Sequence, residues 1–114
     1  MTAVALAQGS FYLVTGLWSL VHIASFQKVT GPKTDLWLVK TVGALLVAIG
    51  AGLMLAAVND QFDPSVVLIA VASAAVLLAV DLIYVYKRII SPVYLLDAVA
   101  ETGLIAWWLI SLYR

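Results

Sequence analysis

The chain has 114 residues, of which 65% are hydrophobic and only 11% are charged, and its mean hydropathy is +1.12. A soluble domain is about half apolar and about a quarter charged, so a soluble fold of this size could not bury this much apolar surface. Six Lys and Arg balance six Asp and Glu, so the net charge indicates neither a nucleic-acid partner nor an acidic one. Cysteine is absent, which excludes disulfide exchange and thiolate metal sites.

Four apolar runs are long enough to cross a membrane. A bilayer core of about 30 Å requires about 20 apolar helical residues, and the runs cover residues 3–26, 36–58, 65–86 and 93–113. Short loops between them require neighbouring helices to run antiparallel. The sequence therefore predicts an all-α integral membrane protein with one domain over 1–114, an up-down-up-down four-helix bundle surrounded by the lipid bilayer.

Basic residues are concentrated in the first and third loops. Lys28 and Lys33 lie in residues 27–35, and Lys87 and Arg88 lie in residues 87–92. Because Lys and Arg favour cytoplasmic loops, we expect both loops to face the cytoplasm and both termini to lie on the non-cytoplasmic side. The expected location is the bacterial inner membrane.

A polar seam runs along the first apolar segment at helical spacing. Its members are Gln8, Tyr12, Thr15, Ser19 and His22, which follow one another at steps of four, three, four and three residues. Polar groups in lipid face the bundle interior. Two interpretations stay open: the seam either lines a cavity or holds helices together through hydrogen bonds worth roughly half to two kcal/mol each.

Ionisable residues of all four segments are expected at similar depth in the cytoplasmic half. At about 1.5 Å per residue, His22, Lys40, Asp81 and Asp97 lie about 6 to 9 Å from the cytoplasmic end and Glu101 about 13 Å. Tyr84 follows Asp81 by three residues and shares its face. A charge that faces lipid costs roughly 2.5 to 3.5 kcal/mol. We therefore expect a convergent ligand-binding site of His22, Lys40, Asp81, Tyr84, Asp97 and Glu101.

One lysine cannot balance three acids in such a site. Neutrality requires a proton on one or two carboxylates, a cationic His22, or a bound cation, and Glu101 is the expected proton holder because it lies deepest. Asp81 and Glu101 are the candidates for acid–base chemistry, although the sequence leaves open whether any catalysis takes place. The structural alternative is an ion-pair network in which Lys40 bridges Asp81 and Asp97. No metal or other cofactor is expected, because Lys40 opposes a cation and no Glu-x-x-His pair is present.

The stretch from Val29 to Gly43, VTGPKTDLWLVKTVG, resembles a segment of small four-helix membrane proteins of bacteria that have no assigned activity. More loosely, four short helices with acids and a histidine in one leaflet look like the EXPERA and DoxX-like groups, which include sterol isomerases and sterol-binding proteins. This second resemblance covers the general layout only, and it assigns no catalytic role to any residue.

Three functions are compatible with these features. The first is binding of a small hydrophobic or lipid-like ligand at the ionisable site, with acid–base chemistry as an extension. The second is transport of protons or a small solute by a homo-oligomer, because four short helices make a thin wall for a transport path. The third is a non-catalytic accessory or assembly subunit.

Overall fold

The structure, a computed structural model, describes residues 1–31 and 35–113. These residues are all α-helical apart from their connections, which confirms the predicted all-α class. The helices are α1 (Thr2–Val21), α2 (Ile23–Thr30), α3 (Leu36–Asn59), α4 (Pro64–Tyr86) and α5 (Tyr94–Leu112). All except α2 are long and apolar enough to cross a membrane. Lys33, one of the basic residues of the predicted loop 27–35, lies outside the described residues.

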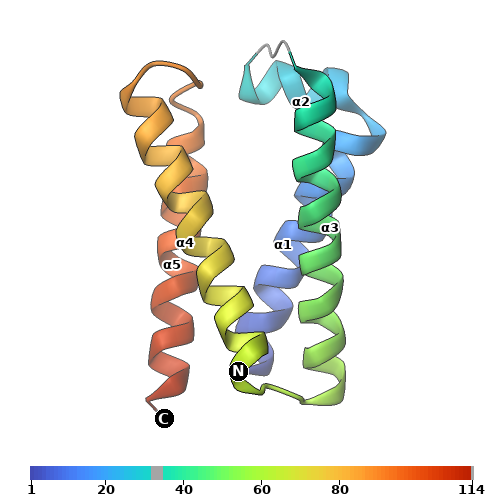
Figure 1. The fold of residues 1–114 in the computed structure, drawn as a ribbon, viewed down its shortest axis with the longest axis vertical. Coiled ribbons are helices and arrows are strands. Elements are labelled where there is room, and N and C mark those ends of the chain that lie inside the picture. The colour runs from blue at the N-terminus through green and yellow to red at the C-terminus, as the bar shows by residue number, and fades with distance from the viewer. Residues whose placement is uncertain (32–34, 114) are drawn as a thin grey trace.

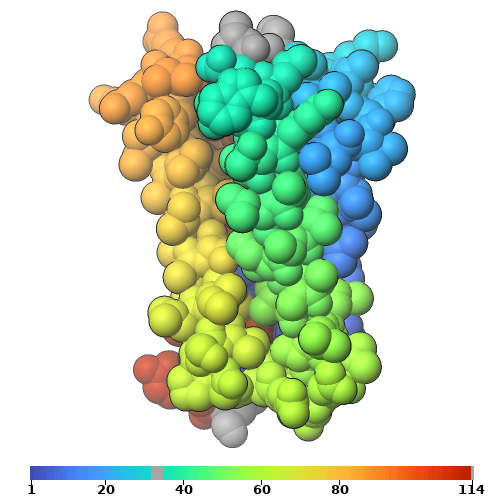
Figure 2. All heavy atoms as spheres, turned by 45° about the vertical axis from the view of Figure 1, so that its right-hand side comes forward, coloured from blue at the N-terminus to red at the C-terminus, as the bar shows by residue number. Residues whose placement is uncertain are grey.

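The four long helices form two pairs, α1 with α3 and α4 with α5. The pairs meet at the end of the molecule that carries both termini and diverge toward the opposite end (Figure 1). In the space-filling view, α3 and α4 form two neighbouring columns (Figure 2). The molecule measures 42 × 28 × 18 Å, so its long axis exceeds the thickness of a bilayer core of about 30 Å.

Glycines bring the backbones of α1 and α3 into close contact. Gly9 of α1 faces Gly50 of α3, and Gly16 faces Gly43. The two glycines on each helix are seven residues apart in the sequence, which is about two helical turns. A methyl group added at Gly50 would lie 2.7 Å from the carbonyl oxygen of Gly9, and one added at Gly16 would collide with that of Gly43. Small residues at matched positions allow this close approach.

The expected first helix, residues 3–26, is divided in the structure. His22 leaves the helical conformation with φ −139° and ψ 67°, and α2 begins at the next residue. The Ser25 amide donates a hydrogen bond to His22 Nδ1 at 3.3 Å, and the indole N–H of Trp18 donates to Ser25 Oγ at 2.8 Å. Trp18 also packs edge-on against the Phe26 ring. These contacts fold α2 back on the end of α1, which the hydropathy of the sequence does not encode.

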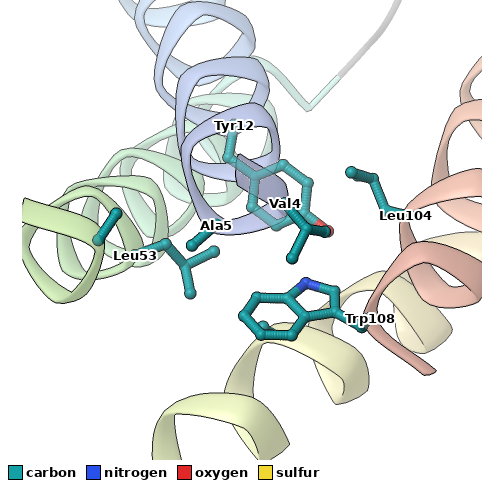
Figure 3. Packing of buried hydrophobic residues seen from close by; sticks show 8 residues of the cluster. Val4, Ala5, Tyr12, Leu53, Leu104 and Trp108 are labelled. Carbon is teal, nitrogen blue, oxygen red and sulfur yellow. The ribbon is translucent and has the colours of Figure 1, made fainter. Parts of the chain in front are cut away.

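The main hydrophobic core lies at the end where the two helix pairs meet. Trp108 of α5 and Leu53 of α3 converge there on Val4 and Ala5 of α1 (Figure 3). Trp108 is fully buried and is the largest of the fully buried side chains. Apolar packing therefore joins the pairs at the end near the termini, and the candidate site lies farther along the same interior.

Candidate functional site

Gln8 connects α1 to both helices of the second pair. Its side chain is fully buried. Gln8 Nε2 donates to the backbone oxygen of Ala70 in α4 at 2.9 Å, and Gln8 Oε1 accepts from Nε1 of Trp108 in α5 at 2.6 Å. Ala70 and Ala74 are both fully buried, and their small side chains let the amide reach a carbonyl that also serves the helix. Both the nitrogen and the oxygen of the Gln8 amide therefore form hydrogen bonds to the second helix pair.

Tyr12 makes the next connection, one turn farther along α1. Its hydroxyl donates to Glu101 Oε2 at 2.8 Å, and both side chains are buried. Gln8 and Tyr12 are four residues apart, and Glu101 and Trp108 are seven apart, so each pair lies on one helix face. The antiparallel directions of α1 and α5 then place Gln8 opposite Trp108 and Tyr12 opposite Glu101.

Three carboxyl groups continue this polar row and form what we call the carboxyl cluster: Asp81, Asp97 and Glu101. Asp81 of α4 is 4% exposed, Glu101 is 0% exposed and Asp97 is half-buried. The charge of Asp97 acts on Asp81 and Glu101 alike. Like charges near one another in a buried site favour a proton on at least one of the three acids.

Two oxygens of the carboxyl cluster have no hydrogen-bond partner. They are Asp81 Oδ2 and Glu101 Oε1, and no other buried side-chain nitrogen or oxygen of the described residues shares this property. A buried polar atom without a partner costs about 1 to 3 kcal/mol. Such atoms are typical of places where a proton, a water molecule or a ligand binds.

The remaining predicted site residues lie apart from the carboxyl cluster. His22, Lys40 and Tyr84 are all exposed, and none of them is among the groups that act on Asp81 or Glu101. His22 caps α2 as described above, and Tyr84 has the Lys87 ammonium 5.9 Å from its ring centre. The structure thus brings the three acids together without the lysine and the histidine that were expected to accompany them.

The rest of the polar seam has local roles. Ser19 is buried, and its hydroxyl donates to the backbone oxygen of Gly16 at 2.9 Å. Thr15 is half-buried. Among the described residues of the seam, Gln8 and Tyr12 form the side-chain hydrogen bonds that reach the second helix pair. The seam acts as interhelical glue at these two positions, which is one of its two predicted roles.

The geometry of the carboxyl cluster does not form a metal cage. Among the described residues, no three His, Cys, Asp or Glu side chains are grouped closely enough to hold a metal ion. The acids instead follow one another as a row that ends at Tyr12 and Gln8. Such a row suits proton exchange or hydrogen bonding to a ligand group.

Sequence reasoning did not include Trp108 in the site. A signal for it exists, because Trp108 follows Glu101 by seven residues and so lies on the same helix face. A buried tryptophan also needs a partner for its indole N–H, and Gln8 of α1 supplies it.

Comparisons of the chain with protein-family models, curated proteins and solved structures found no match.

Proposed function

We propose that this chain is a multi-pass protein of a bacterial inner membrane with both termini on the non-cytoplasmic side. The described basic residues at the divergent end, Lys28, Lys87 and Arg88, support this orientation through the preference of Lys and Arg for cytoplasmic loops. The connection between α3 and α4, which contains Asp60 and Asp63, lies at the other end, near the chain termini (Figure 1). Reporter fusions at the N-terminus and at residues 88–90 test the orientation, and a cytoplasmic N-terminus would overturn it.

Within this membrane, the protein binds a small hydrophobic or lipid-like ligand whose polar group contacts the carboxyl cluster. The observation that carries the proposal is the pair of buried, unpartnered oxygens, Asp81 Oδ2 and Glu101 Oε1. They belong to helices of one pair, and Tyr12 reaches Glu101 from the other pair. A polar ligand group between them would receive hydrogen-bond partners from α4 and α5, with its apolar part among the surrounding apolar side chains.

Asp81 and Glu101 are the groups that exchange a proton with the ligand. Acid–base work requires a carboxyl group within hydrogen-bonding reach of the reacting group, with a neighbour that accepts or returns the proton. The Tyr12 hydroxyl stands in that relation to Glu101, and the charge of Asp97 acts on Asp81. His22 and Lys40, which are exposed, take no part.

Native mass spectrometry of the protein in mild detergent tests this function. We expect a copurified lipid-like molecule on the wild-type protein and its loss in Asp81→Asn and Glu101→Gln. Asp35→Asn is the matched control, because Asp35 is exposed and its side chain makes no capping hydrogen bond. Equal ligand retention in all four proteins would remove the carboxyl cluster from binding.

A second candidate function is proton transfer across the membrane by a homo-oligomer. The polar groups Asp81, Asp97, Glu101, Tyr12 and Gln8 favour it, because Tyr12 donates to Glu101 and the charge of Asp97 acts on Asp81 and Glu101. Proton flux into liposomes should then disappear in Glu101→Gln. Unchanged flux in that variant would exclude Glu101 from the path, and the mass spectrum would report the oligomeric state.

A further inference from the structure

The charged groups around the carboxyl cluster have only one sign. The titratable groups that face it are Asp81 from α4, Asp97 and Glu101 from α5, and Tyr12 from α1. Every described basic side chain, namely His22, Lys28, Lys40, Lys87 and Arg88, is exposed. A buried carboxylate is stable only when it is paired or protonated. The interior therefore lacks a counter-charge that its own described residues could provide.

The carboxyl cluster also has more hydrogen-bond acceptors than donors. Carboxylates only accept hydrogen bonds, and among these groups the Tyr12 hydroxyl donates to Glu101 Oε2. The oxygens that remain, Asp81 Oδ2 and Glu101 Oε1, lie on α4 and α5. A complementary ligand group supplies at least two donors, one for each helix.

Four kinds of ligand group can be compared on this basis. A carboxylate or phosphate would add negative charge to three acids. A hydroxyl would bring one donor and no charge, and a metal ion would need a cage that the described acids do not form. An alkylammonium brings one positive charge and as many as three donors, as a lysine ammonium does. Of the four groups, only the alkylammonium supplies both the positive charge and the hydrogen-bond donors that the carboxyl cluster lacks.

We propose that the carboxyl cluster binds a lipophilic amine through its ammonium group. This proposal rests on the proposed ligand-binding function and names the chemistry of the ligand. The ammonium replaces a proton carried by one of the three acids: that carboxyl O–H bond breaks, its proton leaves to the solvent, and ammonium N–H groups donate to the carboxylates in its place. No oxidant or other reactant is required. The apolar tail extends among the apolar side chains between the helix pairs.

Binding of decylamine, 1-decanol and decanoic acid to the detergent-solubilised protein tests this assignment. These probes share a ten-carbon chain and differ in the polar group. We expect decylamine to bind at least ten times more tightly than either of the others, as measured by native mass spectrometry. The same binding should weaken at least tenfold in Asp81→Asn and Glu101→Gln and remain unchanged in Asp35→Asn.

A proton count keeps the test independent of how well the variants fold. At pH 7 free decylamine carries a proton, as lysine does, so its binding to the wild-type cluster should release about one proton per molecule into a weakly buffered solution. Equal affinity for decylamine and decanol would overturn the amine assignment and leave the proposed ligand site intact. Loss of the copurified ligand from neither cluster variant, together with no decylamine binding, would overturn both.

Discussion

The two interfaces of α1 differ in chemistry. Against α3, α1 presents Gly9 and Gly16, and the contact is made by backbone approach and apolar packing. Against α4 and α5 it presents Gln8 and Tyr12, and the contact depends on three side-chain hydrogen bonds together with the core around Trp108. Close packing of two backbones at glycines cannot be replaced by a contact with water or a ligand, whereas a side-chain hydrogen bond can be exchanged for one with water or a ligand. The first interface is therefore fixed by shape, and the second contains the hydrogen bonds that the proposed ligand would exchange.

The largest effect is expected from filling the glycine interface. In Gly16→Ala the new methyl group meets the backbone oxygen of Gly43 and lies 2.9 Å from a methyl carbon of Val47. Because backbone cannot move aside as a side chain can, we expect a loss of about 3 kcal/mol in the free energy of unfolding, the upper end of the usual cost of overpacking. Titration with a denaturing detergent measures it.

Gly52→Ala is the matched control for that substitution. Nothing lies within 4 Å of the methyl group it would add, and alanine replaces glycine in a helix with a gain of up to about 1 kcal/mol. If both substitutions changed the free energy of unfolding by the same amount and sign, the interface would not depend on close backbone approach.

The second-largest effect is expected at the polar interface of α1 with α4 and α5. A substitution there should loosen the contact between the two helix pairs without unfolding the helices. Gln8→Leu removes the bonds to Ala70 and Trp108 and leaves the Trp108 indole N–H unsatisfied. We expect a loss of about 1 to 2 kcal/mol in the free energy of unfolding. Helical content should stay unchanged, because each pair keeps its own packing.

Spin labels report the separation directly. The chain contains no cysteine, so single cysteines at the exposed Leu45 of α3 and Val99 of α5 give one label on each pair. The distance distribution between the labels should broaden in Gln8→Leu. It should remain that of the wild type in Gln61→Leu, a control in the exposed loop between α3 and α4. An unchanged distribution in Gln8→Leu would mean that apolar packing alone fixes the pairs.

A smaller effect is expected at Tyr12. Tyr12→Phe removes one interhelical hydrogen bond, to Glu101, and such bonds in membrane proteins are worth about 0.6 kcal/mol on average. A double-mutant cycle of Tyr12→Phe and Glu101→Gln measures the coupling free energy, and Tyr113→Phe, at a 90% exposed position, is the control. Strictly additive losses would indicate that the bond does not contribute to the interface.

The helices were predictable from the sequence to the extent that they depend on hydropathy. Four apolar runs were enough to predict an all-α chain with four long helices, because the length and composition of such runs are local properties. The break at His22 was not predictable in the same way. No glycine or proline marks it, and the contacts that stabilise it join Trp18, Ser25 and Phe26, which the hydropathy pattern does not connect.

The packing face of α3 shows a similar limit. Small residues recur at four-residue spacing at Ala44, Ala48, Gly52 and Ala56, with Gly43 and Gly50 nearby, and this spacing favours a close helix contact. In the structure Ala56 is buried, whereas the other three residues of the repeat are exposed. Ala48 and Gly52 border an apolar groove of about 290 Å³ between α3 and α4. Gly43 and Gly50 pack instead. Which face of α3 packs depends on the matching glycines of α1, Gly9 and Gly16. The sequence of α3 by itself therefore does not specify the packed face.

For the candidate site, the sequence contains the position of a residue along its helix but not the direction in which its side chain points. The rise per residue of a helix places Lys40 and His22 at the height of the acids, but it does not specify the rotation of a side chain about the helix axis. Both side chains are exposed in the structure, whereas Gln8, Tyr12 and Glu101 are buried. The rotation depends on how the pairs pack, and this is why the acids lie together without the basic residues.

The smallest effect extends the comparison to a polar contact outside the membrane-spanning segments. Asp63 precedes α4, and its Oδ1 accepts hydrogen bonds from the Ser65 hydroxyl at 2.6 Å and the Val66 amide at 3.0 Å. These bonds, that of Ser65 above all, hold the pKa of Asp63 below its ordinary value of 3.8. The folded state thus favours ionised Asp63, which stabilises the protein above pH 3.8 and ceases to do so as the pH falls through the lowered pKa.

Asp63→Asn isolates this contribution, because asparagine also caps helices and does not titrate near this pH. We expect the Tm of the wild type to exceed that of the variant slightly at pH 5 and the difference to shrink as the pH is lowered below 3.8. Asp35→Asn, at a helix start without a capping side-chain bond, should show no such change. A difference that stayed constant between pH 5 and pH 3 would mean that the charge of Asp63 contributes nothing to the stability of the protein.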